Sequence, residues 1–386
     1  MGLKQTFSLV QTTFLLQIKC DCFGDGRSGR ERESDAGAPR NLRPCWTEDC
    51  STGRTSICLC SVYKHFPFQI NNWGGPISLA VVFPEDVDDR TTERLVSCTA
   101  RELDRLRHKH ANVTQRLSGH FVIPRRRRVC RSEEIFEILK RDRSSGICMT
   151  RLNARTDEET VRAFISYPIN VARNFARKMV KTKFMAIADL DHIFSANFEQ
   201  KMAKLANETL EENSKLALVY RIFEVDKKVT RLPKTKEDLK KLVDERSACV
   251  FHPWFPGHRI RSLDEWFQAN SSDPSEPPSI QFVQPYKKTN WEPQFVSLTT
   301  IPEHDETFFY PFADNTVLRW EMCRKGYEFA VVNDVFMFHH GIKAEAERRL
   351  VDKSRFTIER ETRRAKAAFM RRMEEEHPET KGKCGF

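Results

Sequence analysis

Continuous apolar runs alternate with segments of helical spacing along most of this chain. Strand-like runs occupy 76–83, 119–124, 184–188 and 216–220. Helical spacing occupies 91–110, 132–143, 170–182, 197–212 and 235–247, and a long charged helix is expected over 343–376. Strands that alternate with helices in this way predict a doubly wound α/β sheet, with ligands bound beyond the carboxyl ends of its strands.

The first 60 residues differ in composition from the rest. Residues 24–40 are rich in Gly, Ser, Arg and acidic side chains and contain almost nothing to bury. We therefore predict a flexible stem over 1–60 and one globular unit over 61–386. The apolar segment at 7–18 is too short and too polar for a bilayer span, so it is read as a weak signal-peptide core or as a poor membrane anchor.

Cysteines and glycosylation sequons favour the secretory pathway. The chain has 12 cysteines, and N-x-[ST] triplets begin at Asn112, Asn207 and Asn270. Disulfides persist and asparagine is glycosylated in that compartment. The net charge is +10, with much of the excess in the RRRR run at 125–128 and in the C-terminal helix. Such runs are usually solvated faces, so we expect an anionic small-molecule substrate and no nucleic-acid partner.

Two aspartates, Asp189 and Asp191, follow the apolar strand FMAIA. Carboxylates this close repel each other unless a cation lies between them, and oxygen ligands suit Mg²⁺ or Mn²⁺ shared with substrate phosphates. Two alternatives stay open for the pair. It is either a plain turn or capping pair, or the nucleophile motif of a haloacid-dehalogenase-type phosphatase, although that motif normally lies near the start of its fold.

Two further segments bear on this site. The helix at 170–182 carries Asn170, Arg173, Asn174 and Arg177 on one face, which either grips a diphosphate and a sugar or is solvated. A second apolar strand ends in His339 and His340. His339 is a candidate metal ligand, and the alternative is hydrogen bonding or simple exposure.

The order of these motifs resembles glycosyltransferase family 49. The resemblance is carried by WGGPIS at 73–78, YPINVARNFARKMVKTKFMAIADLD at 167–191, WEPQFV at 291–296, HDETF at 304–308 and FMFHHGIK at 336–343. It implies a GT-A fold, a mixed sheet flanked by helices, with a nucleotide-sugar half over about 61–215 and an acceptor half over about 216–386. It also implies a type II membrane enzyme of the Golgi that uses a UDP-sugar donor.

The resemblance further implies which residues form the site. Mn²⁺, with Mg²⁺ as the alternative, would be bound by Asp189, Asp191 and His339. Asn170, Arg173 and Asn174 would face the donor together with the two aspartates. Glucuronic acid is the favoured sugar, and the acceptor is a glycan or glycoprotein. A catalytically degenerate sugar-binding module of the same fold is the non-enzyme alternative.

The expected reaction inverts the anomeric centre and needs a general base near the acceptor hydroxyl. Asp314 and Asp305 are the candidates, and the alternative for Asp314 is a helix N-cap. Trp291 and Glu292 are expected to shape the acceptor site, because an indole can stack on a sugar face. The alternative for Trp291 is a position in the hydrophobic core.

Overall fold

The computed structural model describes most of the globular part of the chain. The described residues are 8–11, 20–23, 72–83, 88–109, 116–124, 156–189, 191–269, 276–342 and 345–385. The predicted helix at 132–143, the RRRR run and the sequons at Asn112 and Asn270 lie outside them. Asn207, the remaining sequon, lies in a helix with its side-chain oxygen buried.

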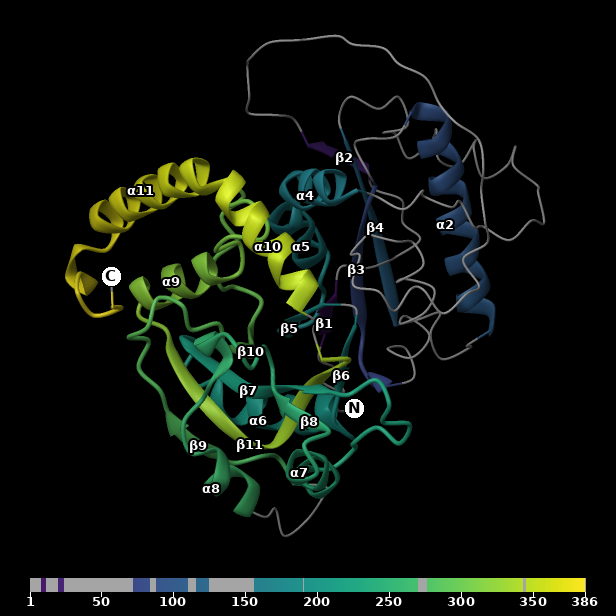
Figure 1. Ribbon diagram of the computed structural model, residues 1–386. Helices are drawn as coiled ribbons and strands as arrows, with labels where there is room; N and C mark the ends of the chain where they lie inside the picture. The colour runs from purple at the N-terminus through teal and green to yellow at the C-terminus, as the bar shows by residue number, and fades with distance from the viewer. Residues whose placement is uncertain are drawn as a thin grey trace.

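A mixed sheet of eleven strands forms the centre of the described structure, in the order β2-β4-β3-β1-β5-β10-β7-β11-β6, with β8 paired to β7 and β9 to β11 (Figure 1). Its strands are β1 Ser8–Gln11, β2 Cys20–Phe23, β3 Ile77–Val82, β4 Leu117–Pro124, β5 Phe184–Ala188, β6 His192–Phe194, β7 Leu216–Val225, β8 Ala248–Val250, β9 Ile280–Val283, β10 Gln294–Leu298 and β11 Glu328–His340. All pairings among the first five strands are parallel, whereas β10 is antiparallel to both β5 and β7. The predicted α/β class and mixed sheet are confirmed.

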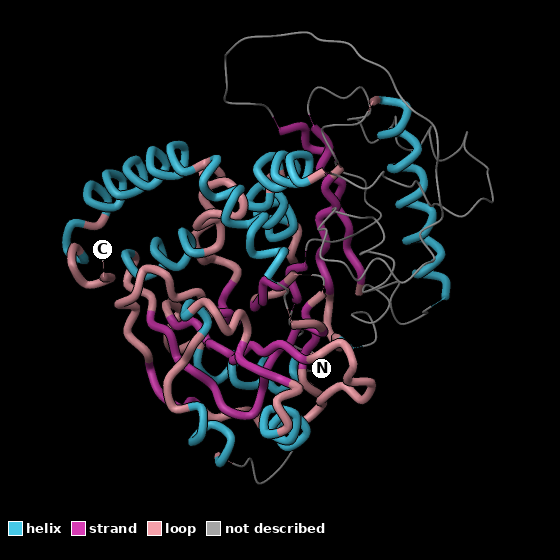
Figure 2. Tube along the Cα trace, in the orientation of Figure 1, coloured by secondary structure: helices cyan, strands magenta, loops and turns pink. Residues whose placement is uncertain are grey.

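Helices cover both faces of this sheet (Figure 2). They are α2 Asp89–Lys109, α4 Asp157–Ser166, α5 Ile169–Lys178, α6 Phe198–Thr209, α7 Lys236–Asp244, α8 Leu263–Gln268, α9 Thr316–Arg324, α10 Glu345–Thr357 and α11 Glu359–Glu376, with short 3₁₀ turns at η3 Pro256–His258 and η4 Pro378–Thr380. Along β5, Phe184 and Ala186 pack in the cluster that contains α2 and α6, while Met185 packs in the cluster that contains α5, α9 and α11. The period-two alternation of β5 therefore places its successive side chains in two different cores.

The structure differs from the sequence expectations in three places. The strand expected to end in His339 and His340 extends back to Glu328 as one long strand, β11, with a register irregularity between Val331 and Phe336. The expected helix over 343–376 is two helices, α10 and α11, because helical geometry is interrupted at Ile358. Finally, β1 and β2 come from the segment expected to be a flexible stem and pair with the sheet.

Two features join segments that are distant in the sequence. β10 comes from the predicted acceptor half but inserts between β5 and β7, so both halves share one sheet. A disulfide joins Cys323 at the end of α9 to Cys384 near the C-terminus, with a Cα–Cα distance of 5.9 Å. Closing a chain segment of this length stabilises the fold by about 4 kcal/mol in the chain-entropy account.

Candidate active site

The two aspartates lie where β5 leaves the sheet. Asp189 follows the last residue of β5, and the chain turns through Asp191 into β6. This turn is closed by two hydrogen bonds: His192 N–H donates to the Asp189 carbonyl, and Asp189 N–H donates to His192 Nδ1, each at 3.2 Å. His192 is buried and packs edge-on against Phe251. Its ring therefore stabilises the turn that presents the two aspartates.

His339 is brought to this turn by strand pairing. β6 is antiparallel to β11, with His192 opposite His339. The imidazole of His339 lies with Nε2 at 3.2 Å from Asp191 Oδ2. Its Nδ1 is at 2.6 Å from the carbonyl of Gly341, which can only accept, so Nδ1 carries the proton. A neutral ring then turns the lone pair of Nε2 toward a carboxylate oxygen, an arrangement that needs a proton or a cation between the two atoms.

The structure thus brings Asp191 and His339 together, 148 residues apart in sequence by their numbers. The residues described here contain no preformed cluster of three Asp, Glu, His or Cys side chains around one point. Asp189 lies within electrostatic reach of the site interior. Burial first, and then the charge of Asp189, raises the pKa of Tyr167 to about 12. The pKa of Asp314 is also raised, mainly by burial and further by Asp189.

The polar face of α5 is buried and holds a loop. Asn174 receives a hydrogen bond from His304 N–H and donates to the His304 carbonyl, both at 2.8 Å. Asn170 donates to the Asp305 carbonyl at 2.9 Å, and Arg177 donates to the carbonyls of residues 301 and 302. These side chains clamp the segment 301–306, so the face is not solvated. Their contact with a donor stays a prediction.

Arg173 links this face to the predicted base. It donates to Asn170 Oδ1 at 3.1 Å and to Asp314 Oδ2 at 2.9 Å, and the two charged side chains are 9% and 10% exposed. The N-cap of α9 is Asn315, so Asp314 is not the capping residue. Asp305 accepts from Thr307 N–H and Oγ1 in a tight turn and faces Arg372 at 3.5 Å. Both predicted bases therefore have carboxylates that other side chains already bind.

The WEP segment approaches the same edge of the sheet from β10. Trp291 is 3% exposed, and its ring packs between Tyr286 and Phe329 at centroid distances of 5.5 Å. This position favours the core interpretation of Trp291 over sugar stacking. Glu292 is partly exposed and has His258 Nε2 at 3.7 Å from its Oε2. Burial, and then the charge of Asp314, raises the pKa of Glu292 to about 7.

Some residues of this region gave no signal in the sequence analysis. Arg319 is 1% exposed and donates to the carbonyl of Pro293, next to Glu292. Trp254 is 64% exposed in the loop that also carries His258. The sequence shows an arginine within a helix and a tryptophan flanked by prolines. Without the fold, neither residue can be assigned to a site.

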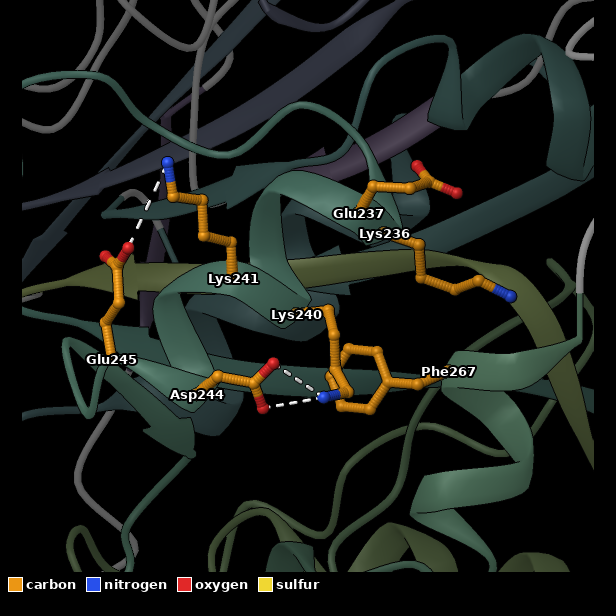
Figure 3. Close-up of a pocket in the computed structure, with 7 residues that line it drawn as sticks. All are labelled: Lys236, Glu237, Lys240, Lys241, Asp244, Glu245 and Phe267. Carbon is orange, nitrogen blue, oxygen red and sulfur yellow. Dashed lines mark hydrogen bonds and ion pairs between the residues drawn. The ribbon is translucent and has the colours of Figure 1, made fainter.

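A surface hollow lies away from these residues, between α7 and α8. Figure 3 shows it lined by Lys240, Lys241 and Asp244 of α7, by Glu245 directly after that helix and by Phe267 of α8. Lys240 pairs with Asp244 at 2.6 Å and lies over the Phe267 ring. The charged side chains satisfy one another along the helix, and nothing in the hollow matches the chemistry at the end of β5.

A mixed α/β sheet with paired aspartates at the end of a central strand is the arrangement of a GT-A-type glycosyltransferase. The sequence profile of glycosyltransferase family 49, described as "Glycosyl-transferase for dystroglycan", matches residues 57–378. The chain belongs to this family. That membership favours the transferase interpretation of the aspartates over the phosphatase one.

Individual relatives agree with this assignment. The chain is 27% identical over 179 residues to "Xylosyl- and glucuronyltransferase LARGE1" of Gallus gallus, a match that covers 45% of this chain and 22% of that protein. It is 26% identical over 188 residues to "Beta-1,4-glucuronyltransferase 1" of Danio rerio, covering 47% of this chain and 42% of the relative. The Mus musculus protein of that name is 22% identical over 290 residues, covering 72% and 65%. The chain thus spans between about a fifth and two thirds of these relatives.

Proposed function

We propose that this protein is a metal-dependent inverting glycosyltransferase that moves a sugar from a UDP-sugar to a glycan acceptor. The observation that carries the proposal is the pairing of β6 with β11, which sets His339 Nε2 at 3.2 Å from Asp191 Oδ2. Family membership supplies the reaction class. Glucuronic acid is the favoured sugar because the relatives are named as glucuronyltransferases.

The residues at the strand end suit a divalent cation. A carboxylate oxygen and an imidazole lone pair face each other, and Asp189 adds a second carboxylate nearby. Mn²⁺ accepts this mixture of oxygen and nitrogen ligands, and Mg²⁺ is the alternative. When bound, such an ion would offset the phosphate charges of the donor and stabilise UDP as the leaving group. The chain's own part is to fix the ligands, through the His192 turn and the Gly341 carbonyl.

The protein also arranges the surroundings of the reacting groups. Arg173 holds the carboxylate of Asp314 in place, and α5 holds segment 301–306 against the site. Trp254, on the loop that contacts Glu292, presents an exposed indole to an acceptor sugar. Replacing it in Trp254→Ala should raise the acceptor KM with kcat nearly unchanged, and an unaltered KM would remove the indole from the acceptor site.

The secretory pathway, and the Golgi within it, is the compartment that fits these features. The Cys323–Cys384 disulfide requires an oxidising environment to persist. None of the helices in the described ranges is long and apolar enough to cross a bilayer. Fractionation of cells that express the tagged full chain, with a Golgi marker, tests the assignment, and a cytosolic distribution would contradict it.

The test of the proposed function combines binding and transfer. Thermal shift with MnCl₂ and UDP should show stabilisation of the wild type, and UDP-glucuronic acid should give transfer to a glycan panel. Asp191→Asn should lose metal-dependent transfer by at least a hundredfold while keeping its fold. Asp244→Asn, an exposed aspartate on α7, is the matched control and should behave as wild type. Wild-type protein without stabilisation by Mn²⁺ and UDP would instead support the degenerate sugar-binding module.

A further inference from the structure

We propose that Glu292 is the general base that removes the proton from the acceptor hydroxyl. The inference rests on the transfer reaction proposed above and replaces the two bases expected from the sequence, Asp314 and Asp305. It is carried by the position of Glu292 in the sheet, by the state of its carboxylate and by the way its backbone is fixed.

Strand register places Glu292 beside the aspartate turn. β10 is antiparallel to β5, with Val296 opposite Ala186 and Leu298 opposite Phe184. The beginning of β10 therefore lies at the same sheet edge as the end of β5. Glu292 precedes the first residue of β10 by two positions, which sets it level with the turn that carries Asp189 and Asp191.

The carboxylate of Glu292 is held less closely by neighbouring side chains than the carboxylates of Asp314 and Asp305. Its side chain is 22% exposed, and it lies near His258, whose Nε2 is 3.7 Å from Oε2, beyond hydrogen-bond distance. The His258 Nδ1 lies at 3.1 Å from the Glu292 carbonyl and donates to it. This hydrogen bond fixes the His258 ring with Nε2 turned toward the carboxylate. Asp314, in contrast, is bound by Arg173.

Charged groups from several elements set the proton affinity of Glu292. Burial, and then the negative charge of Asp314, raise its pKa, arginines from three helices lower it, and the net result is a pKa of about 7. The groups that face it are His258 of η3, Asp314 before α9, Arg319 of α9, Arg355 of α10, Arg173 of α5 and Tyr286 of the preceding loop. A base with a pKa near the working pH accepts a proton most effectively.

The backbone around Glu292 is held on both sides. Glu292 N–H donates to the Gly257 carbonyl at 2.7 Å, and Arg319 donates to the Pro293 carbonyl at 3.1 and 3.0 Å. Tyr286 Oη donates to the Trp291 carbonyl at 2.8 Å. At Gly257 an added Cβ would lie 2.5 Å from the carbonyl oxygen of Asn290, so a glycine is needed for this approach. A carboxylate on a segment fixed in this way keeps its position during the reaction.

The step balances without a further reactant. The acceptor oxygen attacks the anomeric carbon as its proton passes to Glu292. The bond between that carbon and the β-phosphate oxygen breaks, and its electron pair leaves with UDP. The proton on Glu292 then returns to solvent, so the enzyme is restored.

The test uses a nucleophile that has no proton to lose. Glu292→Gln should lower kcat for transfer to a glycan hydroxyl by about a hundredfold or more, and the fall in kcat/KM that the wild type shows below about pH 7 should disappear. UDP and Mn²⁺ binding should be unchanged, and formation of glycosyl azide from the donor and azide should persist. Glu245→Gln, at an exposed position directly after α7, should match the wild type in every assay.

Each outcome decides the inference. Normal transfer by Glu292→Gln, an acid limb that persists, or equal losses of azide reaction and UDP binding would overturn it. If Glu292→Gln does not fold, Glu292→Asp decides: a lowered kcat with unchanged UDP affinity supports the base, and an unchanged kcat overturns it. Absence of transfer in the wild type would mark the failure of the proposed function itself.

Discussion

α5 and α7 carry charged side chains at the same helical spacings, yet the ion pairs that these side chains form differ in burial. On α5, Arg173 and its partner Asp314 are 9% and 10% exposed. On α7, Lys240 and its partner Asp244 are 45% and 59% exposed. The first pair joins a helix to the loop before another helix, whereas the second joins two residues one turn apart on the same helix. The two ion pairs differ in exposure because of where each helix lies against the sheet, and not because of its pattern of charges.

The same contrast appears within α7 itself. Lys236, one turn before Lys240, is buried and pairs with Asp334 at 3.0 Å while donating to the Trp266 carbonyl. Whether a charged side chain on a helix is solvated or buried therefore depends on which part of the fold packs against it. Four substitutions or conditions test this contrast, from the largest expected effect to the smallest.

Arg173→Met should destabilise the protein by about 3–5 kcal/mol, because it leaves Asp314 buried without its partner. Chemical denaturation followed by tryptophan fluorescence measures the change in the free energy of unfolding. The matched double variant Arg173→Met/Asp314→Leu should recover a large part of the loss. A loss below about 1 kcal/mol in the single variant would show that the pair behaves as a surface ion pair.

The carboxyl of Glu292 makes stability depend on pH. Its folded-state pKa of about 7 lies above the ordinary 4.5, so the folded protein holds the proton more tightly than the unfolded chain. The contribution is fully present below about pH 4.5 and is lost as the pH rises to about 7, by up to about 3 kcal/mol. The unfolding free energy of the wild type should therefore fall relative to that of Glu292→Gln across this range. A constant difference between the two would contradict the raised pKa.

Asn174→Ala should cost about 2–3 kcal/mol, because it removes the partners of a buried backbone N–H and carbonyl of His304. Its hydrogen bonds to His304 are both 2.8 Å long. Thermal unfolding measures the effect, and transfer activity should fall with it as segment 301–306 loosens. Asn213→Ala, whose amide donates to Glu328 at an exposed position, is the control and should change stability far less.

Lys240→Met on α7 should change stability by less than about 0.5 kcal/mol, since its ion pair with Asp244 is exposed and screened. Transfer activity should equal that of the wild type. A loss comparable with that of Arg173→Met would remove the distinction between the two helix faces. Denaturation at low and high salt distinguishes an electrostatic contribution from a packing one.

The sequence predicted the strand that ends in the aspartates, the helix before it and the strand that ends in His339. These elements were readable because continuous apolar runs and helical spacing are local signals. The insertion of β10 between β5 and β7 was not readable, since strand order depends on pairing between distant segments. From sequence alone, Glu292 is expected in the acceptor site and Asp314 or Asp305 as the base. The contacts of these two carboxylates with Arg173 and Thr307 appear only in the folded structure.

By itself the sequence determined the class of fold, because alternating apolar and amphipathic segments admit few other arrangements, and it located two carboxylates and a histidine at strand ends. The tertiary structure decided which side chains meet. Pairing of β6 with β11 brought Asp191 to His339, and burial turned the polar face of α5 toward a loop. Contacts between residues more than a hundred positions apart follow from sheet register and desolvation, and no local pattern of residues encodes them.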